Sequence, residues 1–202
     1  MRDGAWLCLQ GVGGDGIGDA MTNLPPNLAQ LTIREATAAD LPELHALVEY
    51  CYRNSDNTGW THEGRLFDGP RTDIASLSGV LDAPGQVILI ADGGNGPMAS
   101  VQVGQARDAT SYLGLLCVDP ALQAGGLAKR MIAAAEALAA GRFAATIMEM
   151  TVINHRPELI AYYQRRGYAP TGEVRYLAPG LGQLRDDICL LVLAKALLPA
   201  VV

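Results

Sequence analysis

The segment from Ser111 to Val152 constrains the fold more than any other part of the chain. An apolar run, "SYLGLLCVD", leads through Pro120 and the adjacent Gly125 and Gly126 into a helical pattern, and a second strand-like run, "ATIMEMTV", follows. One side of the helical pattern is apolar at Leu127, Met131, Ala135 and Leu138, and Gly141 is expected to close the helix. The segment therefore predicts two strands joined by a helical crossover.

The residues before this unit predict one strand, two helices and two further strands. The run over 31–36 is strand-like, and Asp40 with Glu43 three positions later forms a capping-box pattern at the start of a helix over 40–52. The apolar face of this helix comprises Leu41, Leu44, Val48 and Cys51. A second helix, over 72–83, has its stripe at Ile74, Leu77 and Leu81. Runs rich in valine and isoleucine then predict an antiparallel meander that ends in the first crossover strand.

After the crossover, Pro157 suits the first turn of another helix, and Gly167 suits its end. Strand-like runs over 168–177 and 186–196 complete the pattern. The chain has 202 residues, of which 50% are hydrophobic, and this is enough for one globular domain with a substantial core. We therefore expect a single domain over 31–202, of the α/β (α+β) class.

The first thirty residues hold six glycines and two prolines without an apolar period, so we expect a flexible leader over 1–30. Within it, Gly11, Gly13 and Gly16 match the letters of the dinucleotide-binding fingerprint. Pro25 and Pro26 follow where that motif needs a helix. An oxidoreductase that uses this run remains an alternative, and it would require an ordered leader.

Composition excludes several function classes. The net charge of −6, without a cluster of Lys and Arg, argues against a nucleic-acid partner. The longest apolar stretch is broken by Lys195 and Pro199 and falls short of the roughly 20 residues that span a bilayer, so no membrane segment is expected. The N-terminus lacks the apolar core of a signal peptide, which favours a cytoplasmic protein. The cysteines show no metal-ligand spacing, so we expect core thiols and no metal site at Cys8, Cys51, Cys117 and Cys189.

Gly125 and Gly126 suggest an anion site before the crossover helix. Because glycine has no Cβ, the backbone there can approach a ligand closely and turn free amides toward it. The positive end of the helix dipole adds to the attraction. Lys129 adds a cation in the first turn, where it would disfavour the helix itself but suit a phosphate.

The same stretch, "LCVDPALQAGGLAKRM", resembles the acetyl-CoA motif of the GNAT superfamily of N-acetyltransferases. The family's strand, Val-x-Pro turn and Gln-x-x-Gly-x-Gly/Ala loop are matched by Val118, Pro120, Gln123, Gly126 and Ala128. A later block, "TVINHRPELIAYYQRRGY", is similar to the family's Asn, Tyr and Gly-aromatic pattern at Asn154, Tyr163, Gly167 and Tyr168. The resemblance covers roughly 31–196.

The resemblance implies a central mixed, mostly antiparallel sheet of six to seven strands with about four flanking helices. A splayed strand pair would hold acetyl-CoA, which is the implied cosubstrate, without a metal. The implied cofactor residues are Leu116, Val118, Gln123, Ala124, Gly125, Gly126, Leu127, Ala128, Lys129, Asn154 and Tyr163. Tyr163 matches the phenol that protonates or hydrogen-bonds the departing thiolate, whereas Tyr162 lies about 100° round the helix. The implied activity is direct acetyl transfer to a primary amine of a small molecule or peptide.

The proton acceptor and the amine substrate are less constrained. Glu149 and Glu63 are the candidate bases, with water as the alternative. The loop that contains Trp60, Glu63 and Arg71 occupies the position of the family's acceptor pocket, although packing could also explain it. A catalytically silent acyl-CoA sensor or interaction module of the same fold is the second hypothesis. The resemblance would make a homodimer unsurprising.

Overall fold

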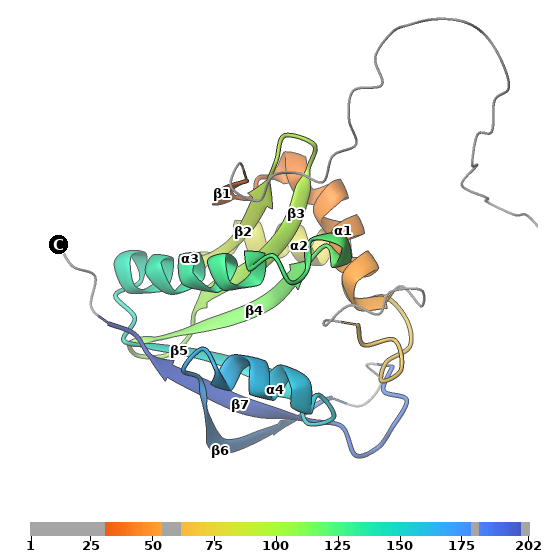
Figure 1. Cartoon of the computed structure of the whole chain (residues 1–202), viewed down its shortest axis with the longest axis vertical. Coiled ribbons are helices and arrows are strands. Elements are labelled where there is room, and N and C mark those ends of the chain that lie inside the picture. The colour runs from red at the N-terminus through yellow and green to blue at the C-terminus, as the bar shows by residue number, and fades with distance from the viewer. Residues whose placement is uncertain (1–30, 54–61, 179–181, 199–202) are drawn as a thin grey trace, which may run out of the picture.

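The computed structural model describes residues 31–53, 62–178 and 182–198. They form a seven-stranded sheet in the order β1-β2-β3-β4-β5-β7-β6 (Figure 1). The strands are β1 (Thr32–Glu35), β2 (Gln86–Asp92), β3 (Pro97–Gln105), β4 (Thr110–Val118), β5 (Ile147–Ile153), β6 (Ala169–Tyr176) and β7 (Cys189–Ala196). The α-helices are α1 (Leu41–Arg53), α2 (Ile74–Asp82), α3 (Leu127–Arg142) and α4 (Pro157–Gln164). Short 3-10 turns, η2 (Ala38–Asp40) and η3 (Pro120–Leu122), precede α1 and follow β4. The predicted order of elements and the mixed, mostly antiparallel sheet are confirmed.

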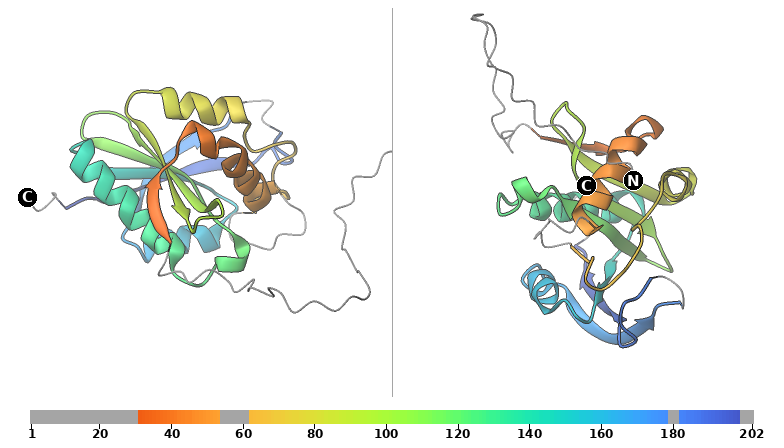
Figure 2. Two further views of the ribbon diagram at one scale, coloured as in Figure 1. Left: turned by 90° about the horizontal axis from the view of Figure 1, so that it is seen from above. Right: turned by 90° about the vertical axis from the view of Figure 1, so that its right-hand side faces the viewer.

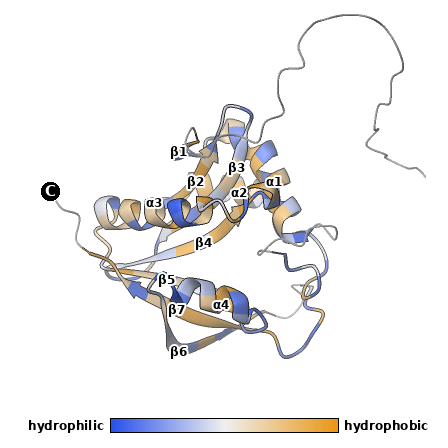
Figure 3. Cartoon of the chain, viewed as in Figure 1, coloured by the Kyte–Doolittle hydropathy of each residue, from blue (hydrophilic) through white to orange (hydrophobic). Residues whose placement is uncertain are grey.

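The helices cover the two faces of the sheet (Figure 2). On one face, Met131 and Ala135 of α3 share a buried cluster with Val101 of β3, and this cluster extends to α4. On the other face, Leu44 of α1 and Leu77 of α2 are buried with residues of β2 and β4. Figure 3 shows the strands coloured mainly hydrophobic, while the helices also carry hydrophilic segments. No helix in the described part of the chain is both long and apolar enough to cross a bilayer.

The strands β4 and β5 are paired at one end only. Their parallel register joins Thr110–Tyr112 to Ile147–Glu149 and then stops, and Figure 1 shows the two strands diverging beyond it. β5 continues to pair with β7 as far as Ile153, so its other edge opens toward the gap. In β4 the register against β3 shifts at a bulge where Leu115 has φ +49°. The splayed pair that the family resemblance implied is therefore present.

Three local predictions were wrong. The capping box forms one turn earlier than expected, because the Asp40 carboxylate accepts hydrogen bonds from Thr37 N at 2.8 Å and from Thr37 Oγ1 at 2.9 Å. Gly141 does not end α3, which continues to Arg142, so this glycine is an internal helical residue. Ile74 is 47% exposed in the first turn of α2, and only Leu77 of the predicted stripe is fully buried.

Candidate active site

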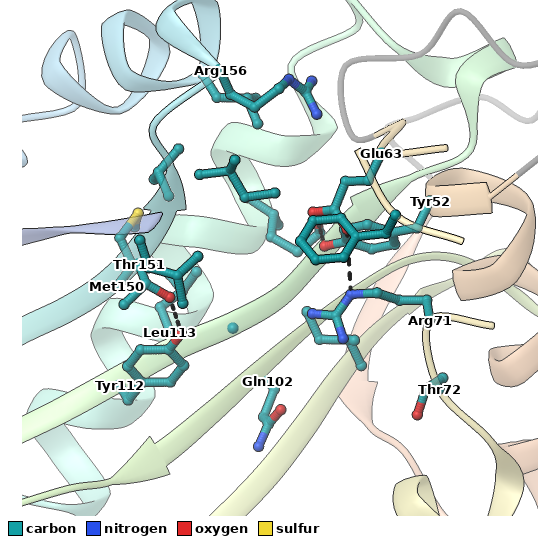
Figure 4. Close-up of a pocket in the computed structure, with 18 of the residues that line it drawn as sticks. Tyr52, Glu63, Arg71, Thr72, Gln102, Tyr112, Leu113, Met150, Thr151 and Arg156 are labelled. Atoms are coloured by element: carbon teal, nitrogen blue, oxygen red, sulfur yellow. Dashed lines mark hydrogen bonds and ion pairs between the residues drawn. The ribbon is translucent and has the colours of Figure 1, made fainter. Parts of the chain in front are cut away.

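Two cavities lie along the splayed strands and meet at the middle of the gap. The smaller cavity, of about 220 Å³, lies between the end of β4, the start of α3 and α4. The larger cavity, of about 470 Å³, lies between α1, the loop before α2, β4 and β5 (Figure 4). Leu116, Leu159 and Tyr163 line both cavities. A group bound in one cavity can therefore reach a group bound in the other at this junction.

The smaller cavity is bounded by the turn that was predicted to hold phosphates. Gly126 precedes α3 in the left-handed region at φ +81°, and a Cβ built there would meet no atom within 4 Å. The first hydrogen bond at this end of α3 runs from Arg130 N to Gly126 O at 3.1 Å, which leaves the amides of Leu127 to Lys129 ahead of the helical ladder. Open space, and amides at a helix N-terminus that have no partner among the described residues, fit a pyrophosphate.

Two details hold this turn against the sheet. The side-chain amide of Gln123 donates to Val118 O at 3.1 Å, so the loop is tied to the end of β4. Ala124 adopts φ +70°, which costs an L-residue with a Cβ roughly 1 kcal/mol. The backbone therefore keeps a conformation that glycine would adopt without this cost.

Tyr163 lies at the junction of the two cavities. The residue is 91% buried, and its ring makes edge contacts with Tyr162 and Tyr168 at centroid distances of 5.4 Å and 6.1 Å. Within the part of the chain that the structure describes, its hydroxyl makes no hydrogen bond. Burial raises the pKa of Tyr163 well above its ordinary value, so the phenol is protonated at neutral pH. Tyr162 lines only the smaller cavity, with the Arg166 guanidinium over its ring.

Comparison with known proteins agrees with this geometry. The sequence matches the family model described as the acetyltransferase (GNAT) family over residues 41–168. The chain belongs to the GNAT acetyltransferase family. No curated protein sequence matches the chain significantly.

Solved acetyltransferases share the fold at low sequence identity. The ribosomal-protein-S18-alanine N-acetyltransferase of Escherichia coli is 16% identical, with a TM-score of 0.61 over 85% of this chain and 96% of that one. Mutant forms of the spermidine/spermine N-acetyltransferase of Vibrio cholerae are 14% identical, with a TM-score of 0.59 over 83% and 94%. The IAA acetyltransferase of Bacillus cereus is 14% identical, with a TM-score of 0.57 over 83% and 99%. At these identities the likeness shows the GNAT fold.

Most of the cofactor residues that the family resemblance implied line the smaller cavity. These are Leu116, Val118, Gln123, Ala124, Gly126, Leu127, Ala128 and Tyr163. Gly125 and Lys129 are exposed on the same turn but do not line the cavity.

Asn154 lines neither cavity. Its Nδ2 donates to Asp187 O at 2.9 Å, and its Oδ1 accepts from Cys189 N at 3.0 Å. Both ends of its side-chain amide thus bind the backbone at and just before the start of β7, and its role as a cofactor residue stays a prediction.

The two candidate bases, Glu149 and Glu63, lie in different surroundings. Glu149 is 5% exposed, lines neither cavity, and is paired with Arg107 at 2.9 Å and with Arg175. This placement keeps Glu149 away from both cavities, and its role as the base stays a prediction. Glu63 lines the larger cavity and is paired with Arg53 at 3.0 Å.

Of the predicted acceptor-pocket residues, Glu63 and Arg71 line the larger cavity, and Trp60 lies outside the described residues. The glycine run from Gly11 to Gly16 also lies outside them. Sequence reasoning missed Tyr52, whose hydroxyl donates to Leu116 O at 3.0 Å.

A second missed feature is a hydrogen bond of 2.7 Å between the hydroxyls of Tyr112 and Thr151. It spans the gap where β4 and β5 begin to diverge (Figure 4). No local pattern could reveal it, because it depends on the register between two strands that the crossover helix separates.

Proposed function

We propose that this GNAT protein transfers the acetyl group of acetyl-CoA directly to a primary amine within a ternary complex. The observation that carries the proposal is the meeting of two cavities at Tyr163, one of them bounded by a phosphate-binding turn. The smaller cavity would take the cosubstrate, with its pyrophosphate on the amides from Leu127 to Lys129. The amine would enter through the larger cavity and reach the thioester at the junction.

The open edge of β4 would align the pantetheine arm near Leu116 and Val118. The carbonyl of Leu116 already accepts from Tyr52, and the carbonyl of Val118 already accepts from Gln123 and from the Cys51 thiol. Pairing in the gap would therefore use backbone amides or the second lone pair of the Leu116 carbonyl. A backbone N–H aimed at the thioester oxygen would stabilise the negative charge that develops there.

The residues at the junction would then supply the proton transfers. As the amine nitrogen attacks the thioester carbon, a C–N bond forms, and the C–S bond breaks when the tetrahedral intermediate collapses. The Tyr163 hydroxyl, protonated and without a hydrogen-bond partner among the described residues, would give its proton to the departing sulfur. The attacking amine would lose its proton to Glu63 or to water in the larger cavity.

Calorimetric titration with acetyl-CoA, with NAD as a comparison ligand, tests the cosubstrate site in the wild type and in Gly126→Asp. The aspartate places a negative charge beside the proposed pyrophosphate, so the affinity for acetyl-CoA should fall at least tenfold. Gly172→Asp is the matched control, because Gly172 has φ +87°, also has open space around it, and lines neither cavity.

The outcomes separate the proposal from its alternatives. Acetyl-CoA binding that only Gly126→Asp weakens, without NAD binding, supports the site. Binding by the wild type, followed by no acetyl transfer to any amine in a broad panel, favours the catalytically silent sensor. Equal binding by all three proteins, or no binding by the wild type, contradicts the assignment of this turn.

A further inference from the structure

The larger cavity carries an excess of positive charge. Among the described residues that line it, the charged side chains are three arginines, Arg53, Arg71 and Arg156, and one carboxylate, Glu63. Arg53 and Glu63 neutralise each other at 3.0 Å. Arg156 is 92% buried and donates to His62 O at 2.8 Å, and it also pairs with Glu158 outside the cavity. Arg71 is therefore the cation whose charge is least compensated.

Arg71 is held in place by its backbone rather than by its side chain. Glu49 Oε1 accepts from Arg71 N and from Thr72 N, each at 2.8 Å, which anchors the loop before α2 to α1. The Arg71 side chain then reaches into the cavity (Figure 4), where its guanidinium lies 5.1 Å from the centroid of the Tyr52 ring. Its Nε forms a long ion pair with Glu63 Oε2 at 3.8 Å, beyond hydrogen-bond distance, and its side-chain nitrogens make no hydrogen bond within the described residues.

Tyr52 connects this arginine to the reaction centre. The same ring that Arg71 faces carries the hydroxyl that donates to Leu116 O, and Leu116 lines both cavities. A small molecule bound to Arg71 therefore extends past one tyrosine ring to the junction at Tyr163. The cavity volume of about 470 Å³ is within the range of small-molecule sites.

We propose that the acceptor is a primary amine that also bears a carboxylate, with the carboxylate bound by Arg71 and the amine directed to the junction. This inference rests on the proposed acetyl transfer and names its substrate class. A planar guanidinium with free N–H groups matches a carboxylate in two parallel hydrogen bonds. A polyamine is disfavoured, because the only carboxylate among the described lining residues, Glu63, already pairs with Arg53 and Arg71, and the positive charges of the polyamine would meet those of the arginines.

The test compares matched acceptors in an assay of CoA release at saturating acetyl-CoA. The panel holds free L-amino acids, the amide of each, short peptides with acidic residues, and spermidine and cadaverine. We expect the acids to exceed their amides in kcat/KM by at least tenfold. The comparison of free amino acids with acidic peptides decides whether the carboxylate belongs to a free amino acid or to a peptide.

Variants at Arg71 assign the effect to this side chain. Arg71→Gln should raise KM for the preferred acid at least tenfold while leaving the rate with its amide within threefold, and Arg71→Lys should restore part of the loss. Arg65→Gln is the control, because this substitution removes the same charge from the same loop. Arg65 is exposed and lines neither cavity. This control should match the wild type.

A binding arm keeps this inference separate from the transfer reaction. Calorimetry of each acid and its amide, without acetyl-CoA, should show binding of the acid that Arg71→Gln removes. If acetyl-CoA is bound and used but amides or polyamines are preferred, or Arg71→Gln and Arg65→Gln behave alike, the inference fails and the proposed function stands. If acetyl-CoA is not bound, the proposed function fails, and the binding arm still decides whether the cavity selects carboxylates.

Discussion

Replacing Tyr163 with Phe should separate catalysis from stability in this protein. The substitution removes one hydroxyl and keeps the ring, with its edge contacts to Tyr162 and Tyr168. Because this hydroxyl makes no hydrogen bond within the described residues, its loss leaves no partner unsatisfied. The free energy of unfolding should therefore change by no more than about 0.5 kcal/mol.

The effect on the chemical step should be much larger. A positioned acid or base contributes about 10²–10⁴-fold to a rate, equivalent to roughly 3–5 kcal/mol of activation free energy. The affinity for acetyl-CoA should change less than threefold, since the ring still lines the smaller cavity. Burial raises the pKa of Tyr163, so the hydroxyl stays protonated through the usual assay range, and the ratio of wild-type to variant rates should be flat from pH 6 to about 9.

The assay is a single-turnover measurement of CoA release, which reports the chemical step even where product release limits kcat. Tyr162→Phe is the matched control, because Tyr162 is adjacent in sequence and lines only the smaller cavity. A Tyr163→Phe rate within threefold of the wild type would refute the role of this hydroxyl. Equal losses in both variants would also refute it, because they would show that the effect is not specific to the Tyr163 hydroxyl.

Two further predictions concern charged residues. Glu149→Gln should lower the free energy of unfolding by about 1–2 kcal/mol and should leave kcat within twofold of the wild type. The loss of stability is smaller than for a fully buried ion pair, because Arg107 and Arg175 are partly exposed. Urea unfolding and initial rates check this, and a kcat loss comparable to that of Tyr163→Phe would return Glu149 to the mechanism. The Arg34 guanidinium lowers the pKa of Asp40, so the stability from this pair is present above the unfolded pKa of about 3.9 and is lost as the pH falls. Asp40→Asn should therefore cost roughly 0.5–1 kcal/mol at pH 7 and progressively less below pH 4, and an undiminished gap at pH 2 in urea unfolding would contradict the linkage.

The smaller cavity could be anticipated from the sequence because its chemistry is local. The chain must turn between β4 and α3 within a few residues, so Gly126 and the free amides that follow it lie together whatever the rest of the fold does. The apolar spacing of Leu44 and Val48 likewise fixes the buried face of α1. The capping box at the start of α1 was predicted less well. The Asp40 carboxylate accepts hydrogen bonds from the Arg34 guanidinium, and a helical pattern does not include a contact between these two residues.

The residues that line the larger cavity could be identified only from the tertiary structure. Glu149 and Glu63 were equivalent candidates in the sequence, and they differ only because the register of β5 brings Glu149 to two arginines, while the loop after α1 brings Glu63 to the cavity. The contact of Arg71 with the Tyr52 ring likewise depends on the fold, because Arg71 lies in the loop before α2 and Tyr52 lies in α1.

The order of the elements, the glycine turn before α3 and the family could be read from the sequence alone, because each rests on spacings within one helix, strand or turn. Three features required the folded arrangement: where β4 leaves β5, which carboxylate faces the larger cavity, and which arginine of that cavity has only a distant counter-charge. These features depend on contacts between residues far apart in the chain, and such contacts leave no periodic trace in the sequence.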